Sequence, residues 1–206
     1  MWWVLIVTIC VIIALQVIAR VAARVHPHPI PPVFYRLIDT PTRNLVMNGE
    51  KTLRRSGLRD GLHVLDLGCG TGFLTFEAAR MVGGGIVYAL DLQRQAVGAV
   101  NGKAKKRRVD NVMPVVADAQ RLPLKDQGID LAFLVATLGE IPNKEAALGE
   151  LRRTLKAGGS ISVTEVVFDP HYVLMGTTRR LAEGSGFDFT ESRGSFLCYT
   201  ANFRKA

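Results

Sequence analysis

One stretch of nine residues, Val64–Gly72 (VLDLGCGTG), constrains this chain more than any other. An apolar run typical of a β-strand ends at Leu67, three glycines follow at alternate positions, and a helix-like segment begins at Phe73. Glycine is needed where the backbone turns sharply and approaches a ligand, because a Cβ atom would obstruct that approach. The stretch therefore predicts the first strand–turn–helix unit of a nucleotide-binding α/β sheet.

The spacing of the glycines indicates which kind of nucleotide the turn would bind. A dinucleotide-binding turn reads G-x-G-x-x-G and places a pyrophosphate at the helix N-terminus. Here the spacing is G-x-G-x-G, and Asp66 stands two residues before the first glycine. A carboxylate beside the loop would repel a pyrophosphate, whereas it suits a cationic ligand. A glycine-rich turn that binds no ligand is the alternative.

This pattern resembles motif I of the class I S-adenosylmethionine-dependent methyltransferases. Their cofactor, S-adenosylmethionine, carries an ammonium and a sulfonium and has no phosphate. The resemblance implies that Asp66 lies near the amino group of the cofactor. It also implies that the loop packs against the methionine part of the cofactor, through Gly68, Cys69, Gly70, Thr71 and Gly72.

Two further motifs follow in the order that this family shows. The apolar run 86–90 is typical of a buried parallel strand and ends in Asp91, which is followed by Leu92. An acid about 20 residues beyond the glycine loop is placed to accept hydrogen bonds from ribose hydroxyls, although it could also cap a helix. After the next strand, Asp118 and Ala119 form an acid–small pair, which the resemblance places at the adenine.

The predicted elements alternate between strands and helices and then end in two strands. The resemblance implies a Rossmann-like class I methyltransferase fold: an α/β, mostly parallel seven-stranded sheet with a C-terminal antiparallel hairpin and helices on both faces. A turn at Arg193-Gly194 is expected to join the last two strands. The expected strands are 63–67, 86–90, 112–117, 129–135, 160–166, 187–192 and 196–203; the expected helices include 73–82, 93–108, 143–155 and 177–183.

The first 25 residues are the most apolar part of the chain. Residues 2–19 contain no charge, and at about 1.5 Å per residue they would span roughly 27 Å, close to the thickness of a bilayer core. This predicts one transmembrane helix over residues 1–25; a cleaved signal peptide and a buried helix are the alternatives. Positive charge follows the segment, so the positive-inside rule places the domain on the cytoplasmic side of the membrane, as a single-pass protein.

A proline-rich linker is expected over residues 26–40, and the methyltransferase domain over residues 41–206, beginning with a helix at Thr40-Pro41. His26 and His28 in the linker have no Cys, Asp or Glu nearby, and the three cysteines are far apart, so no metal site is predicted. The chain carries a net charge of +8, part of it in a basic helix end at residues 103–108. That end is either a solvated helix terminus or a contact with anionic lipid; without interleaved aromatic residues, nucleic acid is not expected as a partner.

The resulting hypothesis is a membrane-anchored methyltransferase that acts on a small, lipophilic acceptor such as a lipid or a quinone-like ring. Because a sulfonium is already an activated leaving group, alignment can supply much of the catalysis, and no catalytic residue is evident. Glu140, Glu165, His171 and Tyr172 follow strands where an acceptor could bind, but a structural role is open for each. A membrane-tethered scaffold without turnover and a nicotinamide oxidoreductase are the alternatives.

Overall fold

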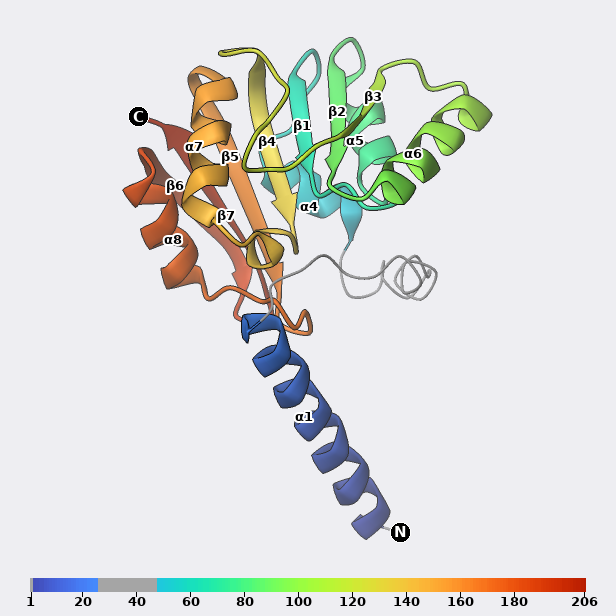
Figure 1. The fold of residues 1–206 in the computed structure, drawn as a ribbon, viewed down its shortest axis with the longest axis vertical. Helices are drawn as coiled ribbons and strands as arrows, with labels where there is room; N and C mark the ends of the chain where they lie inside the picture. Colours follow the sequence, from blue (N-terminus) through green and yellow to red (C-terminus); the bar gives the residue numbers. More distant parts are fainter. Residues whose placement is uncertain (1, 26–47) are drawn as a thin grey trace.

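A computed structural model describes residues 2–25 and 48–206 of the chain. Seven strands form one sheet in the order β3-β2-β1-β4-β5-β7-β6 (Figure 1). The strands are β1 (His63–Leu67), β2 (Ile86–Asp91), β3 (Val112–Val116), β4 (Ile129–Val135), β5 (Leu155–Val166), β6 (Phe187–Ser195) and β7 (Cys198–Lys205). The first five pair in parallel, and β7 pairs antiparallel with both β5 and β6. The predicted mixed sheet with an antiparallel C-terminal hairpin is confirmed.

The central strands are buried on both faces because successive side chains alternate between two cores. Val64 and Leu131 belong to the core that includes Leu53, Ala78 and Val100, whereas Leu65 belongs to the other core. The first core joins the sheet to helices α4 (Gly49–Arg55), α5 (Thr75–Val82) and α6 (Arg94–Arg107). The second joins it to α7 (Lys144–Thr154) and α8 (Met175–Gly184), so helices cover both faces.

The parallel register brings the carboxyl ends of three strands to one edge of the sheet. Leu67, the last residue of β1, pairs with Leu90 near the end of β2. Asp91, the last residue of β2, pairs with Val116 at the end of β3. The loops that follow these strands carry the predicted cofactor motifs, and they therefore lie side by side.

Five predicted strands have bounds that differ from those in the structure: β2 and β3 by one residue, and β5, β6 and β7 by more. β5 begins at Leu155 instead of Ser160, with an irregular register between Ile129 and Leu131 of its neighbour β4. The expected turn of the last hairpin, Arg193-Gly194, lies inside β6, where Gly194 pairs with Tyr199 at a φ of 109°. A glycine in a strand is compatible with such a backbone, so here it does not mark the turn.

The N-terminal segment forms helix α1 (Trp2–Val25), which extends away from the sheet (Figure 1). Over residues 2–25 and 48–206, no helix meets the combined length and hydropathy of a membrane span. The transmembrane anchor is therefore not supported, and the prediction of a single-pass protein with its domain on the cytoplasmic side is wrong by this criterion.

Helix α1 contacts the domain through Arg20. The Arg20 guanidinium donates a hydrogen bond to the Val167 carbonyl and lies 5.9 Å from the centre of the Tyr172 ring. The sequence pattern did not indicate this contact.

The predicted linker, residues 26–40, and the predicted helix start at Thr40-Pro41 lie outside the described residues. Within the described part, α4 begins after Asn48, whose side chain accepts a hydrogen bond from the Lys51 amide at 2.8 Å. Asparagine is a favoured N-cap because its side chain satisfies an amide that has no partner within the helix. α4 then packs Leu53 against α5, so it covers the sheet close to the glycine loop.

Candidate functional site

The glycine loop between β1 and α5 folds over the carboxyl end of β2. The backbone amides of Gly68 and Cys69 both donate to the Leu90 carbonyl, at 2.8 and 3.0 Å. The Gly72 amide donates to the Cys69 carbonyl at 2.9 Å and closes the turn. The loop is thus fixed at the edge of the sheet where ligands bind in open α/β folds.

All three glycines of the loop have positive φ angles, which L residues with side chains rarely adopt. The angles are 77° at Gly68, 53° at Gly70 and 88° at Gly72. A Cβ atom at Gly68 would lie 2.4 Å from the Thr137 side chain, and one at Gly72 would lie 2.9 Å from the Phe76 ring. A Cβ atom at Gly70 would meet nothing within 4 Å, so the middle of the loop faces open space.

Asp66 is buried, with 5% of its surface exposed. Its carboxylate points toward α5 and accepts a hydrogen bond from the Thr75 hydroxyl, with 2.6 Å between the oxygens. This contact ties β1 to the first turn of α5, directly below the glycine loop. The carboxylate thus forms a buried polar contact between the end of β1 and the start of α5, on either side of the glycine loop in sequence.

Asp91 connects the glycine loop to the end of β2. One carboxylate oxygen accepts from the Gly70 amide at 2.9 Å and the other from the Gln93 amide at 2.8 Å. Burial raises the pKa of Asp91, and these amide hydrogen bonds oppose the shift. Each carboxylate oxygen can accept more than one hydrogen bond, so Asp91 retains the capacity to bind hydroxyl groups. The two predicted motifs are therefore in direct contact.

The third motif lies beside the second. The Ala117 amide donates to the Asp91 carbonyl at 3.1 Å, which places Asp118 and Ala119 immediately beyond β2. Asp118 is exposed, and its carboxylate accepts from the backbone and side-chain nitrogens of Gln120. Leu92, with 55% of its surface exposed, offers an apolar surface at the same edge. The residues predicted for one nucleoside-like ligand are thus gathered from three adjacent strand ends.

Cys69 carries the one thiol group of the loop. Burial strongly raises the pKa of its thiol, and the neighbouring carboxylates of Asp66 and Asp91 raise it further. A buried thiol with a raised pKa is a poor nucleophile, because the thiolate is the reactive form. Cys69 therefore packs in the loop as a neutral side chain.

Lys103 contacts the glycine loop, although its sequence neighbours predict only that it belongs to the basic end of a helix. Its ammonium donates to the Thr71 carbonyl at 2.8 Å, and Arg107 of the same helix lies over the Phe76 ring at 4.6 Å. The basic end of α6 is thus partly used inside the domain. The distance of Lys103 from the loop depends on how α6 packs against the sheet, so no local sequence pattern indicates this contact.

Replacing Lys103 with methionine is expected to weaken binding of S-adenosylmethionine about fivefold, because one charged hydrogen bond to the loop is lost. Methionine keeps most of the apolar stem. Calorimetric titration measures the change. Lys106→Met on the exposed side of the same helix is the matched control, since it removes the same charge. Equal affinities for the two variants would contradict a role of Lys103 in holding the loop.

The second half of the same edge, at the ends of β4 and β5, holds a different group of side chains. Ala136 has a φ of 54°, an uncommon conformation for a residue with a side chain, and the adjacent Thr137 faces Gly68.

Glu165, near the end of β5, is buried, with 1% of its surface exposed. Its Oε2 atom accepts a hydrogen bond from the Val173 amide at 3.2 Å, whereas its Oε1 atom has no hydrogen-bond partner among the described residues. Burial, and to a smaller extent the negative charges of Asp169 and Glu140, raise the pKa of Glu165 to about 8, against the opposing effect of the Val173 hydrogen bond.

This raised pKa predicts a pH dependence of stability. The folded protein holds a proton on Glu165 up to about pH 8, whereas the unfolded chain releases it near pH 4.5. The contribution of Glu165 to the free energy of unfolding is therefore fully present below pH 4.5 and is lost as the pH rises toward about 8. Relative to Glu165→Gln, the wild type is expected to lose about 1.4 kcal/mol per pH unit within this window. Urea unfolding at several pH values measures it; parallel pH profiles for the two proteins would refute the assignment.

Among the described residues, no group of three or more His, Cys, Asp or Glu side chains is arranged to hold a metal ion. His26 and His28 of the predicted linker lie outside this part of the chain.

A family model described as "Methyltransferase domain" matches residues 58–190, which include all three motifs. The chain is 32% identical, over 73% of its length, to the ubiquinone/menaquinone biosynthesis C-methyltransferase UbiE of Shewanella pealeana. It is 36% identical, over 60% of its length, to the protein of the same name from Shewanella oneidensis. The matched regions cover 59% and 50% of these two relatives, so the chain spans little more than half of their length.

Solved structures share the fold at lower sequence identity. A SAM-dependent methyltransferase from Aquifex aeolicus superposes with a TM-score of 0.81 at 24% identity, covering 86% of this chain and 100% of that one. The [4+2]-cyclase SpnF superposes with a TM-score of 0.70 at 18% identity, covering 79% of this chain and 81% of that one. Proteins with different chemistry thus share this architecture, and the site must decide the function.

Proposed function

The chain belongs to this family of methyltransferase domains with S-adenosylmethionine as cofactor, and we propose that it transfers the cofactor's methyl group to a small, lipophilic, quinone-like acceptor. The main support for the cofactor assignment is the hydrogen bond between Asp91 and the Gly70 amide, which joins two predicted cofactor motifs at the carboxyl ends of β1 and β2. The acceptor part rests on the side chains at the ends of β4 and β5 and on the names of the relatives.

We propose that the cofactor lies across the ends of β1, β2 and β3. Asp66 supplies negative charge for the ammonium group, and the loop residues Gly68, Cys69, Gly70, Thr71 and Gly72 contact the methionine part. Asp91 accepts hydrogen bonds from the ribose hydroxyls, with Leu92 packed beside it. Asp118 accepts from the adenine amino group, and Ala119 leaves room for the ring. This assignment is supported by the proximity of the three strand ends and by the open space at Gly70.

When bound, the cofactor supplies an electrophilic methyl group on a leaving group that is already positively charged. The protein must then hold the acceptor atom in line with that methyl group and exclude water, which in well-oriented systems is worth up to about 7–11 kcal/mol. Methylation of a protonated acceptor atom would also release one proton at the site. A protein base is needed only where water cannot take that proton.

The ends of β4 and β5 offer the remaining surface of this edge for the acceptor. Tyr172 stacks edge-on with Phe196 at 5.9 Å and with Tyr199 at 6.0 Å between ring centres. Exposed apolar side chains surround this cluster: Phe168, Leu174, Phe196 and Leu197 are each more than half exposed. The Val167 amide donates to the Leu197 carbonyl at 2.8 Å, so these two segments form one rim. An apolar rim next to the methyl-transfer position favours a lipophilic ring as the acceptor.

The relatives support the same class of acceptor, since two of them are named ubiquinone/menaquinone biosynthesis C-methyltransferases. Glu140, Glu165, His171 and Tyr172 lie near the acceptor side of the site. Glu165 and Tyr172 are close enough for the carboxyl group to raise the pKa of the phenol, although burial is the larger cause. We also propose a domain boundary near residue 41, with residues 26–40 as a linker; the family match begins at residue 58.

Methyl transfer is tested by incubating the full chain with methyl-labelled S-adenosylmethionine and a short-chain naphthoquinol or benzoquinol. Mass spectrometry is expected to show one labelled methyl group on a ring carbon. A quinol whose target carbon already carries a methyl group is the control and should give no product. Binding of the cofactor without transfer to any quinol would contradict the acceptor and favour a scaffold without turnover.

A further inference from the structure

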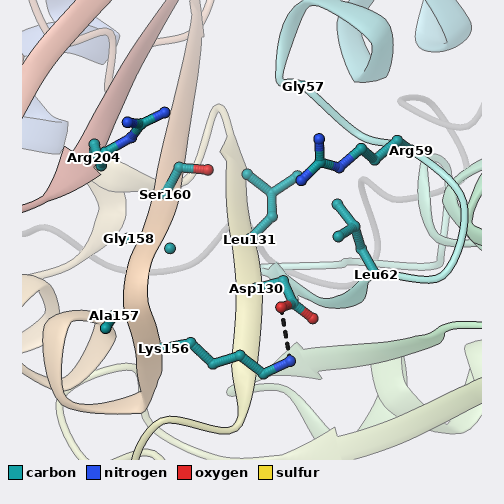
Figure 2. A pocket seen from close by; sticks show the side chains of 11 residues that line it. Gly57, Arg59, Leu62, Asp130, Leu131, Lys156, Ala157, Gly158, Ser160 and Arg204 are labelled. Carbon is teal, nitrogen blue, oxygen red and sulfur yellow. Dashed lines mark hydrogen bonds and ion pairs between the residues drawn. The ribbon is translucent and has the colours of Figure 1, made fainter.

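A pocket lies at the opposite edge of the sheet from the cofactor motifs. It encloses about 370 Å³, within the usual range for small-molecule sites. Its walls come from the loop between α4 and β1, the start of β4, the first half of β5 and the end of β7 (Figure 2). Because β1, β4 and β5 are parallel, the length of the strands separates this pocket from the carboxyl ends that hold the glycine loop.

The pocket carries an excess of positive charge. Three cationic side chains, Arg59, Lys156 and Arg204, line it together with one acid, Asp130. Lys156 is paired with Asp130, with 2.7 Å between the ammonium and the carboxylate, and the Asp130 carboxylate also accepts from the His63 amide. Neither arginine forms an ion pair with a described residue. Among the described residues that line the pocket, the one acid is already paired with Lys156, so the charges of the two arginines are not balanced by a lining residue.

The two arginines line the same pocket from different elements, Arg59 from the loop before β1 and Arg204 from the end of β7. Figure 2 shows Arg59 and Arg204 on opposite sides of the pocket, with Ser160 and Leu131 between them and the Ser160 hydroxyl directed toward Leu131. The turn at Gly158, with a φ of 70°, leaves the β5 side open, because a Cβ atom there would meet nothing within 4 Å. A guanidinium offers several planar donors and binds phosphate groups in a bidentate manner.

We propose that this pocket binds a phosphate-type anion between Arg59 and Arg204, with the Ser160 hydroxyl as a neutral donor. The Lys156–Asp130 pair forms the floor and holds the start of β5 against β4. This site is independent of the methyltransferase activity, since it shares no residue with the cofactor motifs. The chain has a net charge of +8, and in this pocket part of the positive charge forms a specific site for an anionic ligand.

Calorimetric titration of the full chain with inorganic phosphate tests the proposal, with sodium chloride added to keep the ionic strength constant. Saturable binding is expected for the wild type, and Arg59→Gln/Arg204→Gln is expected to weaken it at least about tenfold. The matched control is Lys105→Gln/Lys106→Gln, which removes the same charge from the exposed face of α6 and should leave phosphate binding unchanged.

Titration of every variant with S-adenosylmethionine reports separately on folding and on the cofactor site. Unchanged cofactor affinity in the Arg59→Gln/Arg204→Gln variant, together with lost phosphate binding, supports the second site. Absence of saturable phosphate binding in the folded wild type would overturn it. An equal loss in both double variants would also overturn it, because that result indicates only an effect of net charge.

Discussion

Replacing Asp91 with alanine is expected to weaken the affinity for S-adenosylmethionine about 100-fold, the loss of roughly two hydrogen bonds to a charged acceptor. The same change removes the acceptor of the Gly70 amide and of the Gln93 amide. The loop and the start of α6 thus lose a common anchor. Calorimetric titration of the full chain measures the affinity, and circular dichroism checks that the domain remains folded.

The matched control for this variant is Asp110→Ala, an exposed acid in the turn between α6 and β3. It removes one negative charge without touching the site, so its cofactor affinity should equal that of the wild type. Asp91→Asn should lie between the two, since an amide oxygen still accepts one hydrogen bond from a hydroxyl. Unchanged affinity in a folded Asp91→Ala protein would remove the ribose-binding role.

Replacing Gly68 with alanine is expected to destabilise the unliganded domain by about 3 kcal/mol. Alanine is strained at a φ of 77°, and its Cβ atom would lie 2.4 Å from the Thr137 side chain. The Thr137 Cβ atom itself is only 2.9 Å away, so a rotation of the side chain cannot remove the overlap. The free energy of unfolding in urea, measured without cofactor, gives the cost.

Gly70→Ala separates the backbone strain from the steric overlap, because Gly70 also has a positive φ but a Cβ atom there would meet no neighbour. It is expected to cost about 1 kcal/mol, the backbone term alone. Gly68→Ala combined with Thr137→Gly should recover part of the loss by removing the contacting side chain. If Gly68→Ala and Gly70→Ala cost the same, the close approach of the loop to Thr137 is contradicted.

The first part of the sheet was predictable because β1, β2 and β3 are mostly apolar runs with the motif residues at or just after their ends. His63–Leu67 and Ile129–Val135 have the predicted bounds, and Asp91 ends β2 as part of the strand. The turn of the C-terminal hairpin was misplaced, because Gly194 is used inside a strand at a positive φ. Composition alone does not distinguish a glycine in a turn from one in an edge strand.

The cofactor half of the site was more predictable than its surroundings. Asp66, the glycines and Asp91 are adjacent in sequence to strand ends, so the topology alone brings them together. Lys103 was missed because its contact with Thr71 depends on the packing of α6. The burial of Glu165 likewise depends on the Val173 segment that folds over it. The contact of Arg20 with the Val167 carbonyl joins residues far apart in the chain and has no local signal.

The most direct test of the account is a calorimetric titration of the full chain with S-adenosylmethionine and, in parallel, with NADH. The arrangement of Asp66, the glycine loop and Asp91 predicts saturable binding of S-adenosylmethionine at one site per chain and no binding of NADH. Binding of NADH alone, or no binding of S-adenosylmethionine by the folded protein, would contradict the assignment of the site.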